Sequence, residues 1–103
     1  MNHPLLPDHF DFNGLIPMWM VDQERQKMTR KFTFANFEQA FEFMTLAAQY
    51  AQKIDHHPDW SNSWNKVAVE LATHSSGGLT TLDIQMAQAL DIFAVQVQTS
   101  ESP

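Results

Sequence analysis

The segment from Asn36 to Pro58 places the firmest limit on how this chain can fold. Asn36 can cap a helix, and Gln39 follows at the spacing of a capping box. Because proline disfavours helical geometry at the residue before it, the helix has to end near Asp55. Apolar residues at three- and four-residue steps predict its buried face: Phe37, Ala40, Phe41, Met44, Ala47, Ala48 and Ala51.

Alternating apolar residues predict strands on both sides of this helix. Residues 19–21 and 28–34 flank a polar turn, which is typical of a hairpin. After the helix, Val67, Val69 and Leu71 alternate with smaller or polar residues, and residues 60–64 can add a short strand before them. These segments predict an antiparallel sheet of about four strands.

A second helix follows the loop at residues 75–78. Thr80 and Asp83 are typical of a helix start. Its predicted buried stripe consists of Leu82, Met86, Leu90, Phe93, Ala94 and Val97. The order of elements therefore predicts an α+β fold of two layers, an antiparallel sheet with two long helices packed on one face.

The length of 103 residues predicts a single domain over 1–103, because chains this short rarely hold two cores. Residues 1–18 form a Pro-rich N-terminal arm, whose apolar side chains predict packing against another part of the protein. Residues 98–103 form a polar tail that we expect to fray.

The charge balance excludes several classes of function. The formal net charge is −6, and neither Lys nor Arg occurs after Lys66. Binding to nucleic acid or to an anionic membrane surface requires cations, so we expect neither. The absence of cysteine excludes disulfides, thiolate zinc sites and a cysteine nucleophile. The apolar runs are also too short to span a bilayer.

Three of the five histidines stand at the ends of predicted elements, where functional side chains often lie. His56 and His57 follow the first long helix, and His74 follows the strand that ends near Leu71. Imidazole exchanges protons near neutral pH, so general acid–base catalysis is one interpretation, and a helix cap or surface role is the other. His3 and His9 lie in the arm and receive no role.

The residues leave other kinds of site open. Trp19, Trp60 or Trp64 can supply a stacking wall for a flat aromatic ligand. Zinc is disfavoured because adjacent histidines do not turn easily toward one ion. Ser75 and Ser76 adjoin His74 but lack a nucleophile elbow. Residues 77–78 can bind an anion through backbone amides, although a plain turn is the simpler interpretation.

Fixed spacings connect the histidines with residues further along the chain. After His56, His57 and Pro58, Trp64 comes six residues later, His74 ten further on and Asp83 nine after that. This arrangement resembles the signature of the pterin-4a-carbinolamine dehydratases. The resemblance extends upstream through the segments 30–34 and 37–44 to Trp19, and covers about residues 19–97.

The resemblance implies dehydration of 4a-hydroxytetrahydropterin to quinonoid dihydropterin plus water, in tetrahydrobiopterin recycling. It implies histidine general acid–base catalysis with neither metal nor tightly bound cofactor. The implied catalytic residues are His56, His57 and His74, and the implied substrate-binding residues are Pro58, Trp60, Asp83 and Trp19. For Asp83, orienting an imidazole, bonding the ligand and acting as a first-turn carboxylate of the helix all stay open.

The family also implies a homodimer or homotetramer, a functional link to an aromatic amino-acid hydroxylase and a cytoplasmic location. Two features depart from its pattern. Gln52 stands where members usually carry an acidic or otherwise charged residue, and the Pro-rich arm replaces an N-terminal helix. Because some members serve as dimerisation cofactors of a homeodomain activator, a non-catalytic interaction protein with the same fold is the alternative function. A zinc hydrolase is the third hypothesis.

Overall fold

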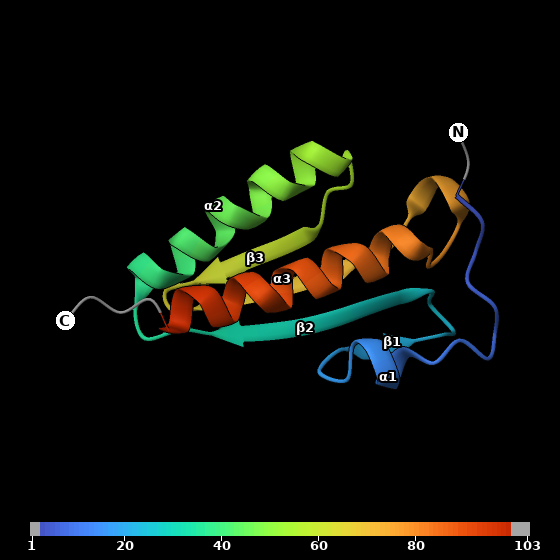
Figure 1. The fold of residues 1–103 in the computed structure, drawn as a ribbon, viewed down its shortest axis with the longest axis horizontal. Coiled ribbons are helices and arrows are strands. Elements are labelled where there is room, and N and C mark those ends of the chain that lie inside the picture. Colours follow the sequence, from blue (N-terminus) through green and yellow to red (C-terminus); the bar gives the residue numbers. More distant parts are fainter. Residues whose placement is uncertain (1–2, 100–103) are drawn as a thin grey trace.

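Four strands and two long helices form two layers in the computed structural model, which describes residues 3–99 (Figure 1). The sheet is antiparallel, with strand order β1-β2-β4-β3. Its strands are β1 (Met20–Asp22), β2 (Lys27–Thr33), β3 (Asp59–Ser63) and β4 (Lys66–Leu71). Helices α2 (Phe37–Ile54) and α3 (Thr81–Thr99) cover one face, and two short helices, α1 (Phe12–Leu15) and the 3₁₀ helix η1 (His74–Ser76), join the other elements. The predicted two-layer α+β fold is confirmed.

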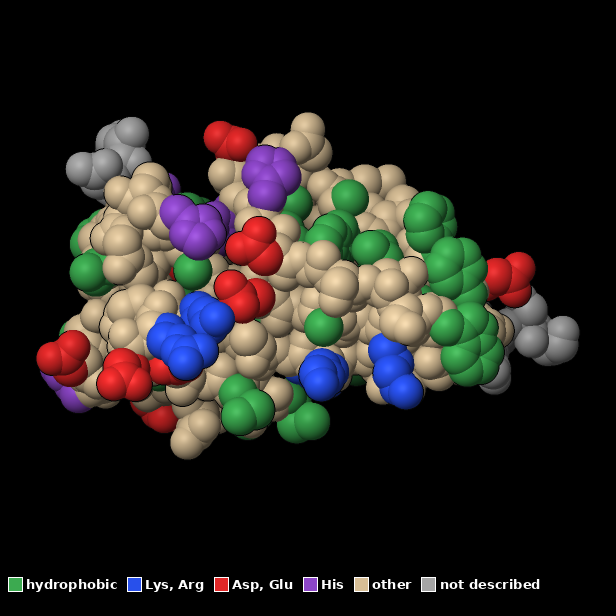
Figure 2. Space-filling view, turned by 180° about the vertical axis from the view of Figure 1, so that it is seen from behind, with side chains coloured by type: hydrophobic (Ala, Val, Ile, Leu, Met, Phe, Trp, Pro, Cys, Tyr) green, Lys and Arg blue, Asp and Glu red, His purple; other side chains and the backbone are tan. Residues whose placement is uncertain are grey.

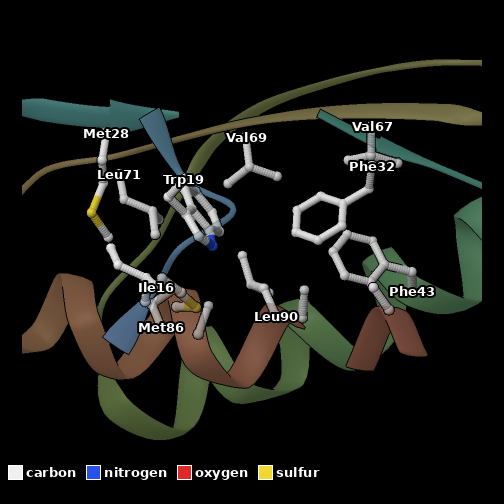
Figure 3. Close-up of a cluster of buried hydrophobic side chains, with 14 of the residues drawn as sticks. Ile16, Trp19, Met28, Phe32, Phe43, Val67, Val69, Leu71, Met86 and Leu90 are labelled. Carbon is white, nitrogen blue, oxygen red and sulfur yellow. The ribbon is translucent and has the colours of Figure 1, made fainter. Parts of the chain in front are cut away.

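The alternation of side chains along β2 and β4 separates the two faces of the sheet. Met28 pairs with Leu71, and Phe32 pairs with Val67, so these four buried side chains share one face. Figure 3 shows the side chains of this face directed toward α3 and toward Phe43 of α2. The helices therefore cover the apolar face and leave the other face of the sheet open.

Capping side chains set the start of α2 close to the predicted position. The Oδ1 atom of Asn36 accepts a hydrogen bond from the Gln39 amide at 2.8 Å. The Gln39 side chain accepts in return from the amide of Ala35 at 3.0 Å, one residue before the cap. The helix ends at Ile54, and Asp55 takes a left-handed conformation, so the predicted end before Pro58 is confirmed.

The predicted buried face of α2 was partly wrong. Phe37 and Phe41 are 45% and 58% exposed and stack on each other, and Ala48 is also exposed. Phe43 is fully buried although the prediction omitted it. Apolar residues occupy a wide arc of this helix, and only the side toward the sheet and α3 is covered. The buried side chains there are Ala40, Phe43, Ala47 and Ala51.

The arm packs on the core, as its apolar side chains predicted. Phe12 and Ile16 of the arm are buried in the core cluster, as is Trp19 directly after it, and Figure 3 shows Ile16 close to Met86 of α3. At the other end, α3 runs two residues into the segment predicted as a polar tail. Gln98 lies in this last turn and donates a hydrogen bond to the Thr33 carbonyl at 2.9 Å. The rest of the predicted tail, residues 100–103, lies outside the described residues.

Candidate functional site

Four histidines, among them the three predicted to be catalytic, line one hollow of about 290 Å³ beside the C-terminal end of α2. His56 and His57 come from the loop after α2, and His74 comes from η1, which follows β4. In Figure 2, histidine side chains gather near one end of the face seen from behind. The structure therefore brings the three predicted catalytic residues together. The complete lining is His3, Asp55, His56, His57, Ala72, Thr73, His74, Ser75 and Leu82.

His56 forms the buried wall of this hollow, and a hydrogen bond to Asp83 holds its imidazole. The Nε2 atom of His56 lies 2.7 Å from Oδ1 of Asp83, and the two residues are 8% and 0% exposed. Because a carboxylate oxygen accepts, we assign the proton of this bond to Nε2 of His56. The Nδ1 atom is then the nitrogen of this ring that can exchange a proton.

The start of α3 holds the Asp83 carboxylate in place. Its second oxygen, Oδ2, accepts hydrogen bonds from the Thr80 amide at 2.9 Å and from the Thr73 hydroxyl at 2.8 Å. The Thr80 hydroxyl accepts in turn from the amide of Leu82 at 3.2 Å, which completes a capping box. One carboxylate therefore both caps a helix and orients an imidazole. Of the three roles that the sequence left open, the contacts of Asp83 are those of an orienting residue and a helix-start carboxylate.

His57 is exposed and is held by Gln52, from the last turns of α2. Its Nε2 atom lies 2.7 Å from the Gln52 side-chain oxygen. With that oxygen accepting, His57 donates from Nε2 and keeps Nδ1 for another partner. The neutral amide at this departure from the family pattern orients the imidazole without placing a charge beside it.

His74 is exposed, with 80% of its side chain accessible and its Nε2 atom 3.5 Å from Oδ2 of Asp59. A tight turn behind it requires glycine at residue 77, where φ is 77°. The amides of Gly77 and Gly78 donate to the carbonyls of His74 and Thr73. Because these amides are used within the turn, the geometry supports a plain turn rather than the anion site.

The predicted aromatic border lies elsewhere. Trp19 is 4% exposed, and its indole N–H donates to the partly buried Asp91 at 2.9 Å. Trp60 is half-buried and lines a separate hollow on the open face of the sheet. Trp64 is exposed at the turn between β3 and β4. Pro58 directly follows His57 but, like the tryptophans, is not among the residues that line the histidine hollow.

Four polar lining residues were not predicted as site residues: His3, Asp55, Thr73 and Ser75. Thr73 and Ser75 flank His74 in sequence, and Asp55 precedes His56, so adjacency was an available signal. His3 is distant in sequence from the other three histidines, and no pattern indicated it. Among residues 3–99, no group of three or more His, Asp or Glu side chains could hold a metal ion, and no helix is long and apolar enough to cross a membrane.

Comparison with known proteins identifies relatives across most of the chain. A family model described as pterin 4 alpha carbinolamine dehydratase matches residues 9–93. A Bordetella avium protein named "Putative pterin-4-alpha-carbinolamine dehydratase" is 47% identical over 83 residues, which are 81% of this chain and 77% of that protein. A Rhizorhabdus wittichii protein of the same name is 49% identical over 79 residues, which are 77% of this chain and 81% of that protein.

Solved structures show the same architecture. The crystal structure of a transcriptional coactivator/pterin dehydratase from Brucella melitensis matches with a TM-score of 0.80 and 43% identity, over 87% of this chain and 98% of that chain. A pterin dehydratase-like protein, described as a RuBisCO assembly factor in the alpha-carboxysome, shares the fold with a TM-score of 0.64 and 18% identity, over 74% and 88% of the two chains. With the family model matched over residues 9–93 and the signature histidines gathered at one hollow, this chain belongs to the pterin 4 alpha carbinolamine dehydratase family.

Proposed function

We propose that the protein dehydrates a 4a-hydroxytetrahydropterin to quinonoid dihydropterin and water. The observation that carries this proposal is the meeting of His56, His57 and His74 on one hollow. Family membership supports the substrate class, because the matched relatives are named for this reaction. The chemistry needs groups that give and take protons, and imidazole is the side chain best suited to both near neutral pH.

The reaction moves one proton onto oxygen and one proton away from nitrogen. The C4a–O bond breaks with its electron pair going to oxygen, which takes a proton and leaves as water. The N5–H proton goes to a base, and the nitrogen electron pair forms the C4a=N5 double bond. Two imidazoles, one protonated and one neutral, are sufficient for this exchange, and the net proton count does not change.

The three histidines differ in ways that suit this exchange. Asp83 is placed to stabilise the imidazolium that forms when His56 takes a proton, so it acts as a positioning residue. His57 and His74 are exposed, and therefore exchange protons readily with water. A positioned acid or base typically contributes about 10²–10⁴-fold to a rate.

The wider role that we propose is tetrahydrobiopterin recycling in the cytoplasm, linked to an aromatic amino-acid hydroxylase. We also propose a homodimer or homotetramer. The sheet supports association, because β1 and β3 are its two edge strands and edge strands tend to be paired or protected.

A second candidate function is a non-catalytic interaction protein with the same fold. Phe37 and Phe41 of α2, and Ile92 and Val95 of α3, are large apolar side chains that are exposed. Exposed apolar surface of this kind is typical of a protein interface. The Brucella melitensis relative, described as a transcriptional coactivator/pterin dehydratase, makes this role relevant to the present chain.

Two measurements separate the candidates. Stopped-flow absorbance follows the decay of 4a-hydroxytetrahydropterin with and without the purified protein, and the dehydratase proposal expects faster decay with protein. Sedimentation velocity of wild type and Phe41→Ser tests whether the exposed apolar surface mediates association. If it does, an oligomer formed by wild type should dissociate in the variant. Equal decay rates combined with association that depends on Phe41 would favour the interaction protein over the dehydratase.

A further inference from the structure

We infer that His3, carried to the histidine hollow by the N-terminal arm, is a substrate-contacting residue that sets binding affinity. This inference rests on the proposed function and adds a fourth imidazole to its site. His3 lines the hollow together with His56, His57 and His74. Its side chain is half-buried, so one part of it is covered by the protein while another part remains accessible.

Two hydrogen bonds hold the arm against the wall of the hollow. The Ser76 hydroxyl donates to the His3 carbonyl at 2.6 Å. Three residues later, the Leu6 amide donates to the Leu79 carbonyl at 2.9 Å. Ser76 is the last residue of η1, which begins at His74, and Leu79 lies between η1 and α3. The position of His3 is therefore fixed relative to a proposed catalytic imidazole.

The surface beneath the arm fits its close approach. Gly78 is buried under Leu5 and Gln26, and a Cβ atom at this position would lie 3.1 Å from the Leu5 side chain. The same Cβ would overlap the side-chain oxygen of Gln26, which lies 3.4 Å from the Leu79 amide. Glycine at residue 78 therefore permits the close approach of Leu5 and Gln26, whose side chains a larger residue would displace.

The chemistry assigns His3 a role in binding. Proton transfer already has three imidazoles in the hollow, one of them fixed by Asp83. A pterin presents ring nitrogens, a carbonyl and an amino group along its edges, and each can pair with an imidazole nitrogen. One such hydrogen bond is worth about a three- to tenfold change in affinity. His3 is therefore expected to act on KM and not on kcat.

The test uses the full chain, with dehydration kinetics and the Kd of 7,8-dihydrobiopterin measured by titration calorimetry. His3→Ala is expected to raise KM and Kd about three- to tenfold, with kcat within about twofold of wild type. His3→Gln, which keeps a hydrogen-bonding group, is expected to recover part of this loss. Ser76→Ala removes the anchor of the arm and is expected to weaken binding in the same direction, by a smaller factor.

His9→Ala is the matched control, because His9 is an exposed imidazole of the same arm that does not line the hollow. It is expected to match wild type in KM, kcat and Kd. If wild type is active and His3→Ala has unchanged KM and Kd, the role of His3 is refuted while the dehydratase proposal stands. If wild type neither binds the pterin nor speeds its dehydration, the proposed function fails and the role of His3 fails with it.

Discussion

The Nε2 atom of His56 lies 2.7 Å from Oδ1 of Asp83 in the buried wall of the histidine hollow, although the two residues are 27 positions apart in sequence. The same carboxylate completes the capping box at the start of α3 through the Thr80 amide. The orientation of a proposed catalytic imidazole is therefore linked to the start of a long helix. A change at Asp83 is expected to affect stability and rate together.

Asp83→Asn tests this linkage. The amide has only one acceptor oxygen for the hydroxyl, amide and imidazole donors that now bond the two carboxylate oxygens. We expect a loss of about 1–3 kcal/mol in the free energy of unfolding, because buried partners lose their acceptor. We also expect kcat to fall by at least about tenfold, which is less than the full contribution of about 10²–10⁴-fold from one positioned acid or base because the imidazole itself remains. Urea unfolding and stopped-flow dehydration measure the two effects.

Asp91→Asn is the matched control for this prediction. Asp91 also lies on α3 and accepts hydrogen bonds from Trp19 and Arg30, but it does not line the hollow. It is expected to lower stability and leave kcat within about twofold of wild type. Equal losses of kcat in the two variants would mean that Asp83 acts on rate only through the stability of the fold.

Gln52 controls the environment of His57 through one exposed hydrogen bond at 2.7 Å. Gln52→Glu places a negative charge there and favours the protonated imidazole. Whichever limb of the pH–rate profile His57 controls should therefore move toward higher pH. Gln52→Ala, which adds no charge, should not produce that displacement. A Gln52→Glu profile that overlays wild type would show that His57 does not take part in the rate-limiting proton transfer.

Trp19 is expected to contribute to stability and not to substrate binding. Its ring packs edge-on to Phe32, and its N–H donates a hydrogen bond to the partly buried Asp91. Trp19→Phe removes that hydrogen bond and part of the buried ring, so we expect a loss of about 1–3 kcal/mol in unfolding free energy. KM for the pterin should stay the same. A raised KM at unchanged kcat would instead support the predicted place of Trp19 at the border of the ligand.

The two faces of α2 give a direct test of the packing. Phe43 is fully buried against Phe32 and Phe34, whereas Phe41 is 58% exposed. Phe43→Ala should cost about 3–5 kcal/mol in unfolding free energy, as expected for a large core side chain. Phe41→Ala should change the unfolding free energy of the monomer by no more than about 0.5 kcal/mol. Similar losses, measured by urea denaturation at low protein concentration, would contradict the observed orientation of the helix.

Local patterns were sufficient to predict most of the architecture. The capping residues Asn36 and Thr80 marked the two helix starts, and the alternation through Val67, Val69 and Leu71 marked a strand. The orientation of α2 was harder to predict, because both Phe41 and Phe43 are apolar and only the sheet determines which one is covered. Periodicity gives the width of an apolar face, but tertiary contacts decide which part of it is buried.

The candidate site was partly predictable for a similar reason. The helix and strand patterns placed His56, His57 and His74 at element ends, the spacings matched the family signature, and the fold brings these ends together. The position of His3 depends on hydrogen bonds between the arm and the segment around Ser76 and Leu79, which no local pattern encodes. The indole of Trp19 binds to Asp91, 72 residues away, and this long-range contact was equally invisible in the sequence.

The central claim is that exposed and buried imidazoles of one hollow dehydrate the pterin, and His74→Ala tests it most directly. Because 80% of the His74 side chain is exposed, its removal should leave the urea midpoint unchanged, unlike a change at buried His56. Stopped-flow decay of 4a-hydroxytetrahydropterin should be accelerated by wild type and by His9→Ala, and His74→Ala should lose most of that acceleration. A His74→Ala rate equal to that of wild type, or a wild-type rate equal to that of buffer, would contradict the claim.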